Sequence, residues 1–285
     1  MNKFKGIIYI ICAGFFFALM TFFVRLSGDL PTMQKAFFRN AVAALVSVVM
    51  LMKSKEHFHI QKGNLPTLFL RATCGTIGLI MNFYAIDKMN ISDANMLNKL
   101  SPFFAIIASY FILKERANVV EWITVAIAFC GSLFIIKPSF NIASGYALIG
   151  AMGGMFAGLA YTFVRKLGQR GERGPVIVMF FSTFSCLVCL PFLIFQYEPM
   201  AFWQLGFLLL AGLSATGGQL CITQAYTCAP AKEISVFDYT QVVFAALLGF
   251  VFLHQLPDIY SFIGYIIIIG CAVYKWFYMK NHSVS

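Results

Sequence analysis

The sequence predicts an all-α membrane protein whose ten transmembrane helices form two inverted repeats of five. Three observations lead to this prediction. Hydrophobic residues make up 60% of the 285 residues and charged residues only 11%, whereas soluble domains contain about 25% charged residues. The apolar residues form ten runs, each long enough to cross a bilayer. Two stretches, 18–25 and 93–105, are related to stretches that lie 140 residues later in the chain.

The first five helices are predicted within residues 1–138, which form the first repeat. A helix needs about 20 apolar residues to cross roughly 30 Å of hydrocarbon. The apolar runs between charged residues and helix breakers place these helices near residues 4–26, 31–52, 66–86, 91–113 and 117–136. The first run follows two lysines, as in a signal peptide, but it continues to Val24 without a small-residue cleavage pattern. We therefore expect it to be a spanning helix.

The second five helices are predicted within residues 139–285, which form the second repeat. They lie near residues 144–165, 174–196, 201–226, 231–253 and 257–278. In the first of them Gly150, Gly154 and Gly158 recur every four residues, a spacing that lets another helix approach closely. The loops are short throughout, so the sequence leaves no room for an extramembrane domain.

The cationic residues predict that both termini lie in the cytoplasm. With the N-terminus inside, fourteen Lys and Arg residues fall on the cytoplasmic side, and the other side receives only Arg25, Lys35, Lys88 and Lys137. Cytoplasmic loops of membrane proteins carry such an excess. We therefore expect a multi-pass protein of the cell membrane, surrounded by lipids. The net charge of +10 does not indicate nucleic-acid binding, because these cations flank apolar runs instead of gathering on one water-exposed face.

The internal repeat predicts that the two halves are inverted. Residues 18–25 and 158–165 share four of eight residues, and the same offset pairs polar positions inside predicted helices: Asp93 with Glu233, Asn98 with Asp238, and Ser101 with Gln241. Since each half has five spans, an odd number, the halves enter the membrane with opposite polarity. This design recurs in transporters. Two similar halves can exchange conformations, which moves the opening of a central path from one face to the other.

Polar residues in the predicted fourth helix mark a candidate solute path, because a charged side chain at the centre of a spanning helix costs about 2.5–3.5 kcal/mol. Asp93 fits either a helix cap near the interface or the path itself. Asn98 lies deeper and favours the path, together with Ser101. Lys99 either extends outward to the interface or neutralises a nearby acid. Pro102 removes a backbone donor and is expected to bend this helix.

The predicted ninth helix repeats this arrangement, with Asp238 and Gln241 one turn apart on a common face. Asp238 fits three roles: accepting a proton, binding a cationic group, or pairing with Lys99 or Arg39 as a structural contact. Arg39, in the second helix, fits either an interface residue that meets lipid headgroups or a member of a buried ion pair.

Neutral polar and aromatic residues complete the candidate site. Neutral amides facing lipid would be costly, so those of the third and eighth helices are expected to face either the solute or neighbouring helices. The candidate solute-binding residues are Asp93, Asn98, Ser101, Tyr84, Tyr161, Gln219, Gln224, Asp238 and Gln241, with Arg39 and Lys99 as ion-pair candidates.

No pattern in the sequence indicates a metal, a cofactor or catalytic residues. The eight cysteines lie in or beside apolar runs, where cysteine behaves as a small hydrophobe. Cys186 and Cys189 form a C-x-x-C without histidine or acidic neighbours, which is a weak metal signal. There is no phosphate-binding loop of the type G-x-x-x-x-G-K-[ST]. We predict neither a metal nor another cofactor, and the sequence indicates no oligomeric state.

Several short motifs give the chain a family resemblance. They are Phe37-Phe38-Arg39, Phe83-Tyr84-Ala85-Ile86, Ser92-Asp93-Ala94, Leu100-Ser101-Pro102-Phe103-Phe104, Leu113-Lys114-Glu115-Arg116 and Lys137-Pro138, with weaker counterparts in Phe244-Ala245-Ala246-Leu247-Leu248-Gly249 and Leu253-His254-Gln255. On these residues the chain resembles the EamA family of ten-helix carriers, in the drug/metabolite transporter superfamily, over about residues 4–278. It departs from the family pattern at Val242, which stands opposite Pro102, and at His254-Gln255, opposite Lys114-Glu115.

The resemblance implies two inverted five-helix units around a cavity lined by the first, third, fourth, sixth, eighth and ninth helices. We therefore expect a secondary transporter that moves a small metabolite, such as an amino acid or a related zwitterionic or amphipathic solute, by alternating access. The alternative is an intramembrane enzyme that acts on lipid or prenyl substrates. That chemistry usually needs clustered histidines and acids, and only His254 lies near a span, so we expect no enzyme.

Overall fold

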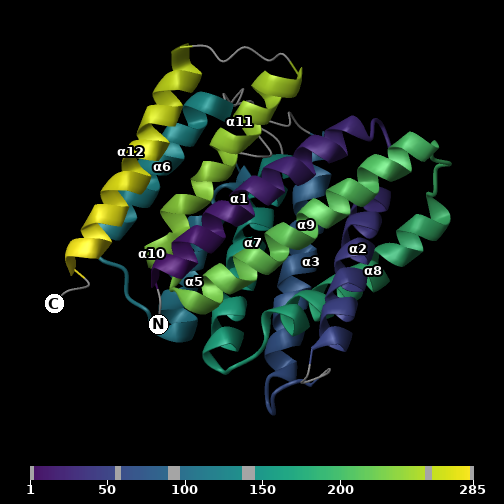
Figure 1. Cartoon of the computed structure of the whole chain (residues 1–285), viewed down its shortest axis with the longest axis horizontal. Coiled ribbons are helices and arrows are strands. Elements are labelled where there is room, and N and C mark those ends of the chain that lie inside the picture. The colour runs from purple at the N-terminus through teal and green to yellow at the C-terminus, as the bar shows by residue number, and fades with distance from the viewer. Residues whose placement is uncertain (1–2, 55–58, 89–96, 137–144, 254–258, 283–285) are drawn as a thin grey trace.

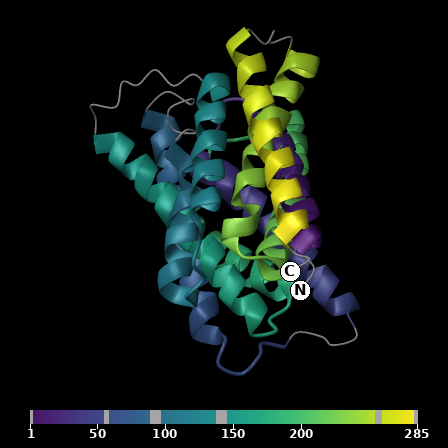
Figure 2. The same ribbon diagram turned by 90° about the vertical axis from the view of Figure 1, so that its left-hand side faces the viewer.

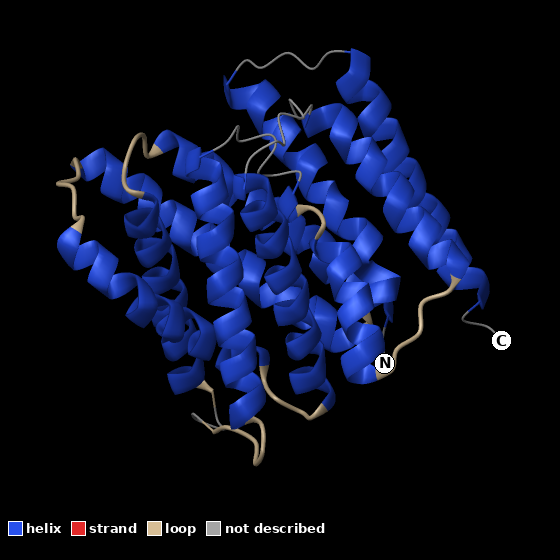
Figure 3. Ribbon diagram, turned by 180° about the vertical axis from the view of Figure 1, so that it is seen from behind, coloured by secondary structure: helices blue, strands red, loops and turns tan. Residues whose placement is uncertain are grey.

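The protein is an all-α bundle, as predicted. A computed structural model describes residues 3–54, 59–88, 97–136, 145–253 and 259–282. The described residues are helical apart from short turns and contain no strand (Figure 3). Large apolar side chains point outward from them, including Phe195, Phe202 and Ile266, which are 85%, 94% and 73% exposed. Such a surface suits hydrocarbon, because lipid tails are as apolar as these side chains.

The prediction of ten spanning segments is confirmed. Eight helical segments are long and apolar enough to cross a membrane, and two shorter apolar helices, Ser101–Leu113 and Val119–Phe134, complete the set within the described residues. The helices are α1 (Lys3–Leu26), α2 (Thr32–Lys53), α3 (Leu65–Lys88), α5 (Ser101–Leu113), α6 (Val119–Ile136), α7 (Gly145–Gln169), α8 (Gly174–Phe195), α9 (Phe202–Cys228), α10 (Ala231–Ile234), α11 (Thr240–Leu253) and α12 (Ile259–His282). Apart from the start of the fourth span, which lies outside the described residues, helix ends agree with the prediction within four residues.

Two predicted helices are interrupted, and the prediction of continuous helices is wrong there. In the ninth span, α10 ends at Ile234, a 3-10 helix covers Ser235–Tyr239, and α11 begins at Thr240. In the fourth span a turn at residues 99–100 precedes α5, and Pro102 lies in the first turn of that helix. Proline fits this position because the first amides of a helix have no intrahelical partner. Pro102 therefore starts a helix instead of bending one.

The halves of the chain interlock along their lengths. Figure 1 shows α1 beside α9, α2 beside α8, and α6 beside α12, and α3 packs on α7. Every one of these pairs joins a helix from residues 1–138 to one from residues 139–285. The 140-residue offset maps the α1–α9 pair onto the α7–α3 pair, so the packing has the pseudo-two-fold relation that inverted repeats require. The boundary between residues 138 and 139 lies outside the described residues and stays a prediction.

Rows of small residues bring helices into backbone contact beside the two interruptions. A Cβ atom added at Gly154 would lie 2.7 Å from the carbonyl oxygen of Leu97, and one added at Gly158 would lie 2.7 Å from the amide nitrogen of Ala105. At Gly14, the position related to Gly154, an added Cβ would lie 3.1 Å from the amide nitrogen of Gln241. The predicted close packing of this stripe is confirmed, and it places the interrupted spans in the middle of the bundle.

The helices run between two ends of the bundle, which we name for their position. α1 begins and α12 ends at the same end (Figure 2), which we call the terminal end; the opposite end is the far end. Ten spans return the chain to the side on which it starts. The prediction that the terminal end faces the cytoplasm stays a prediction.

Candidate solute-binding site

A cavity of about 150 Å³ lies between the two halves, in the central part of the bundle. Arg71 is the seventh residue of α3, ~9 Å along the helix from the terminal end, and Arg39 is the eighth residue of α2, ~10 Å from the far end, at 1.5 Å per residue. Apolar side chains, among them Phe17, Met20 and Phe83, form part of the wall. The polar lining residues are Arg39, Arg71, Asn82, Asn98, Tyr161, Gln219 and Gln241.

Neighbouring side chains contact one nitrogen and one face of the Arg71 guanidinium group. Its Nη2 donates a hydrogen bond of 3.2 Å to Oε1 of Gln219, and its Cζ lies 3.9 Å from the ring centroid of Phe181. Gly75, one turn further along α3, makes room, because a Cβ there would lie 2.5 Å from Nη1 of Arg71. The residue is 2% exposed, and its buried Nε has no hydrogen-bond partner.

Arg39 is buried without a counter-charge among the described residues. It is 8% exposed, its Nε has no hydrogen-bond partner, and no ion pair or hydrogen bond of its side chain occurs in the described part of the chain. The predicted ion pair of Arg39 is therefore not formed there. The other interpretation, contact with lipid headgroups, also fails, because the side chain faces the cavity inside the bundle. A guanidinium has five donors, and buried donors without partners are costly.

Lys99, Asp238 and Gln241 form what we call the inter-repeat cluster. Nζ of Lys99 lies 3.1 Å from Oδ2 of Asp238 and donates to Oε1 of Gln241 at 2.8 Å. The hydroxyl of Tyr239 donates to the carbonyl oxygen of Lys99 at 3.1 Å. The cluster thus joins the interruption of the fourth span to that of the ninth. Of the roles predicted for Asp238, pairing with Lys99 is the one the structure shows, and Lys99 neutralises an acid instead of extending to the interface.

Three other predicted residues, Asn98, Tyr161 and Gln219, lie in the cavity lining, together with Gln241 of the inter-repeat cluster. The Tyr161 ring stacks on the ring of Tyr226, with centroids 4.9 Å apart and planes at 15°. These side chains come from the fourth, sixth, eighth and ninth spans, which the family resemblance implies as lining helices. The second and seventh spans also contribute, through Arg39 and Phe181.

The structure places three further predicted residues, Ser101, Gln224 and Tyr84, outside the cavity lining. Ser101 is buried beside α7 but is not part of the lining. Gln224 lies against the start of α8, 3.5 Å from the position of a Cβ at Gly174. Tyr84 is 41% exposed and packs on Tyr146, with ring centroids 6.1 Å apart. Asp93 lies outside the described residues.

The predicted site residues do not include two polar lining residues, Arg71 and Asn82, or the lining residue Phe181, which contacts Arg71. The signal for Arg71 is present in the sequence, since it is a single cation inside an apolar run, as Arg39 is. Asn82 is likewise an amide inside an apolar run. Phe181 has no such signal, because the chain contains 32 phenylalanines and nothing in the sequence distinguishes this one from the others.

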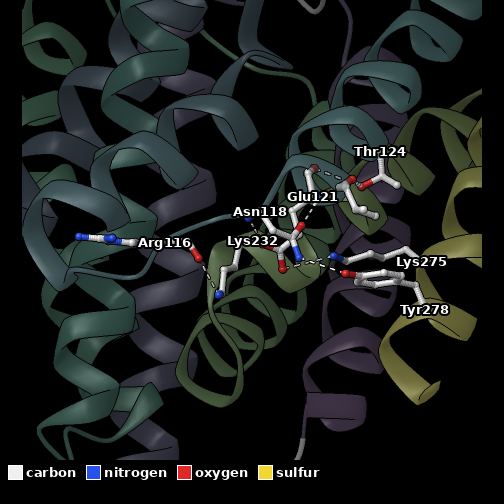
Figure 4. Close-up of polar contacts among 8 residues, drawn as sticks. Arg116, Asn118, Glu121, Thr124, Lys232, Lys275 and Tyr278 are labelled. Carbon is white, nitrogen blue, oxygen red and sulfur yellow. Dashed lines mark hydrogen bonds and ion pairs between the residues drawn. The ribbon is translucent and has the colours of Figure 1, made fainter. Parts of the chain in front are cut away.

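A second buried charge pair lies outside the cavity and holds α12 against α6 (Figure 4). Asn118 and Glu121 cap the start of α6 reciprocally. The backbone amide of Asn118 donates to Oε2 of Glu121 at 2.8 Å, and the backbone amide of Glu121 donates to Oδ1 of Asn118 at 2.9 Å. Lys275, 1% exposed, then donates to Oε1 of Glu121 at 3.4 Å. This pair joins α6 to α12, and neither of its residues lines the cavity.

Polar contacts also join the two halves at the terminal end. Nε of Arg165 in α7 lies 3.1 Å from Oε1 of Glu115, and Nη1 of Arg165 donates at 2.9 Å to the carbonyl oxygen of Thr227 in its own half. Nζ of Lys232 donates to the carbonyl oxygen of Arg116 at 2.7 Å (Figure 4).

The terminal-end ion pair has no complete counterpart in the sequence. The 140-residue offset relates Arg165 to Arg25, but it relates Glu115 to Gln255, which lies outside the described residues. At the position related to the carboxylate of the Arg165–Glu115 pair, the sequence therefore has an amide.

Comparisons with known proteins agree with this architecture. The model of a family described as the EamA-like transporter family matches residues 4–137 and again residues 144–274. The pseudopaline exporter CntI of Pseudomonas aeruginosa is 30% identical over 273 residues, which cover 94% of this chain and 95% of the relative. Human solute carrier family 35 member G1 is 24% identical, with 95% and 80% covered. A solved crystal structure superposes with a TM-score of 0.81 at 14% identity, covering 94% of both chains.

Proposed function

Because the chain belongs to the EamA-like transporter family, we propose that it is a secondary transporter that moves a small metabolite across the cell membrane by alternating access. The cavity is the observation that carries this proposal. It lies at the interface of the two halves, at mid-depth, and it is lined by polar groups of which several have no partner. Transporters built from inverted repeats place their solute sites at this position.

The contacts at the terminal end suggest how access would alternate. The Arg165–Glu115 pair and the bond from Lys232 to Arg116 join the halves there, so they must break before the cavity opens to that end. At Gly14, Gly154 and Gly158 the helices meet through backbone atoms, so no side chain of these residues would block one helix from sliding on the other. The inter-repeat cluster lies beside these glycine contacts, where the two halves would rock against each other.

The lining supports a small solute with both polar and apolar parts, such as an amino acid or a related compound. Amide and hydroxyl groups can satisfy polar groups of the solute, and Phe17, Phe83 and Met20 can contact its carbon skeleton. The names of two relatives, an exporter and a solute carrier, describe transport of solutes by those proteins. We expect the same class of activity here, with no cofactor, no metal and no catalytic residues.

Flux through proteoliposomes tests the proposal. Purified protein should take up or exchange a member of a labelled metabolite pool without ATP, and the flux should saturate with solute concentration. Asn98→Ala, which removes an amide from the lining, should slow the flux, whereas Lys275→Arg in the Lys275–Glu121 pair should leave it near the wild-type rate. Proteoliposomes that move no member of a broad pool faster than empty liposomes would refute the proposed function.

A further inference from the structure

The charges around the cavity do not balance. Its lining contains two arginines and no aspartate or glutamate, within the described part of the chain. Lys99 and Asp238 of the inter-repeat cluster lie beside the cavity, but they are paired with each other at 3.1 Å. The described residues of the cavity therefore carry a net charge of about two positive units, contributed by Arg39 and Arg71.

Both guanidinium groups are buried and have donors left over. Arg39 is 8% exposed and Arg71 2%, and Nε of each has no hydrogen-bond partner. An uncompensated buried cation costs several kcal/mol, and two of the same sign in one small cavity repel each other. Elsewhere in the bundle, Lys99, Arg165 and Lys275 are buried beside carboxylates. The two arginines of the cavity thus stand apart from the other buried cations.

We infer that the transported solute is an anion whose carboxylate or phosphate group binds between Arg39 and Arg71. The inference rests on the proposed transport function and narrows its solute to one with a net negative charge. A planar guanidinium matches the two oxygens of an oxyanion through paired N–H donors. The two arginines come from α2 and α3, and one oxyanion between them would attract both; a dianionic phosphate would balance both charges, whereas a single carboxylate would balance one.

The neighbours of Arg71 hold it ready for this contact. Gln219 accepts from its Nη2, the Phe181 ring covers one face of the guanidinium, and Gly75 leaves the space that the group occupies. These three are positioning residues. They use one nitrogen and one face of the guanidinium, so Nε stays available.

The rest of the lining limits the size and polarity of the solute. Oδ1 of Asn82 is buried in the lining without a hydrogen-bond partner, so it can accept a bond from an N–H or O–H group of the solute. Phe17 and Phe83 provide apolar wall. A cavity of about 150 Å³ holds a molecule about the size of benzene. The solute that fits this conformation is a small organic anion with a short carbon skeleton, or phosphate itself.

Binding measurements with four probes test the inference. Purified wild-type protein is titrated with succinate, inorganic phosphate, leucine and the dication putrescine, and its melting temperature and heat of binding are recorded. We expect succinate or phosphate to raise the melting temperature in a saturable way, and the stronger of the two identifies the solute group as carboxylate or phosphate. If leucine or putrescine binds and neither anion does, or if none of the four binds to the folded protein, the inference is wrong.

Matched variants separate the site from a general effect of charge. Arg39→Gln and Arg71→Gln should each weaken anion binding about ten- to hundred-fold, the effect of losing a hydrogen bond to a charged group. Arg170→Gln removes the same charge from an exposed loop and should leave binding unchanged.

Gly75→Ala should also weaken binding, because its Cβ displaces Arg71, whereas Gly206→Ala, with nothing within 4 Å of the added atom, should not. Wild-type affinity for the anion in Arg39→Gln and Arg71→Gln would overturn the inference. If Arg39→Gln does not fold, the same measurement is made with Arg39→Lys.

Flux measurements distinguish this inference from the proposed function. If proteoliposomes move leucine or putrescine but no anion, the inference that the solute is an anion is wrong and the proposed transport function is retained. If the protein binds anions through Arg39 and Arg71 but moves no solute, the anion site is supported and the proposed transport function is wrong.

Discussion

Buried cations in this protein have two kinds of surroundings. Lys99 has Asp238 and Gln241 within hydrogen-bonding distance, and Lys275 has Glu121. Arg39 has none of these partners among the described residues. Removing one member of a buried pair leaves a charge uncompensated and costs about 3–5 kcal/mol, whereas removing a charge that has no partner removes a cost. The same kind of substitution should therefore have opposite effects at the two places.

Thermal unfolding of the protein without solute tests this contrast. Asp238→Asn leaves Lys99 buried without its carboxylate and should lower the stability by about 3 kcal/mol, with partial recovery in the double variant Lys99→Gln/Asp238→Asn. Arg39→Met should unfold at the wild-type temperature or above it, because the methionine fills similar space without a charge. A loss of stability in Arg39→Met as large as that in Asp238→Asn would show that Arg39 has a structural partner and would contradict our description of the cavity.

At the scale of elements, the sequence predicts where the spanning helices lie but not where they break. Residues 231–253 and the described part of 91–113 have the apolar composition of ordinary spanning helices, and the breaks depend on contacts between distant parts of the chain. Tyr239 binds the backbone of Lys99 across the interface, and Asp238 binds its side chain. A 3-10 segment that such tertiary contacts stabilise has no local signature, since its residues also suit an α-helix.

The end-to-end asymmetry of the bundle leads to a second prediction. The Arg165–Glu115 pair joins the two halves at the terminal end, and the 140-residue offset relates its two residues to Arg25 and Gln255, an arginine and an amide. Removing the pair with Arg165→Gln should favour states that are open at the terminal end. A loss of about 1.4 kcal/mol of closing energy corresponds to a tenfold rise in the open population.

Cysteine labelling measures this shift. In a variant that lacks the native cysteines and carries Ala160→Cys in the cavity lining, the rate of reaction with an impermeant thiol reagent from the terminal side should rise about tenfold when Arg165→Gln is added. Arg25→Gln, the related substitution at the far end, is the control and should change this rate little. Equal rates with and without Arg165→Gln would mean that this ion pair does not hold the terminal end closed.

At the scale of the whole molecule, most of the fold could be predicted from the sequence because the bilayer imposes simple rules. Apolar runs of about 20 residues predict spans, and an odd number of spans per repeat predicts inversion. The site is harder to predict. Isolated charges inside apolar runs mark Arg39, Lys99 and Arg71 as residues that need a partner or a cavity, but which of them pairs with Asp238 depends on how the helices pack. The structure gives this partner to Lys99 and leaves Arg39 and Arg71 in the cavity.

Access to one cavity residue from the two faces tests alternating access most directly. Leu79 lines the cavity in α3, and Leu79→Cys in a variant without native cysteines gives a single reporter. In oriented vesicles that transport solute, this cysteine should react with an impermeant reagent applied to either face, and reagent bound from one face should protect it from the other. If the cysteine in transporting vesicles reacts from one face only, the two halves do not alternate around this cavity.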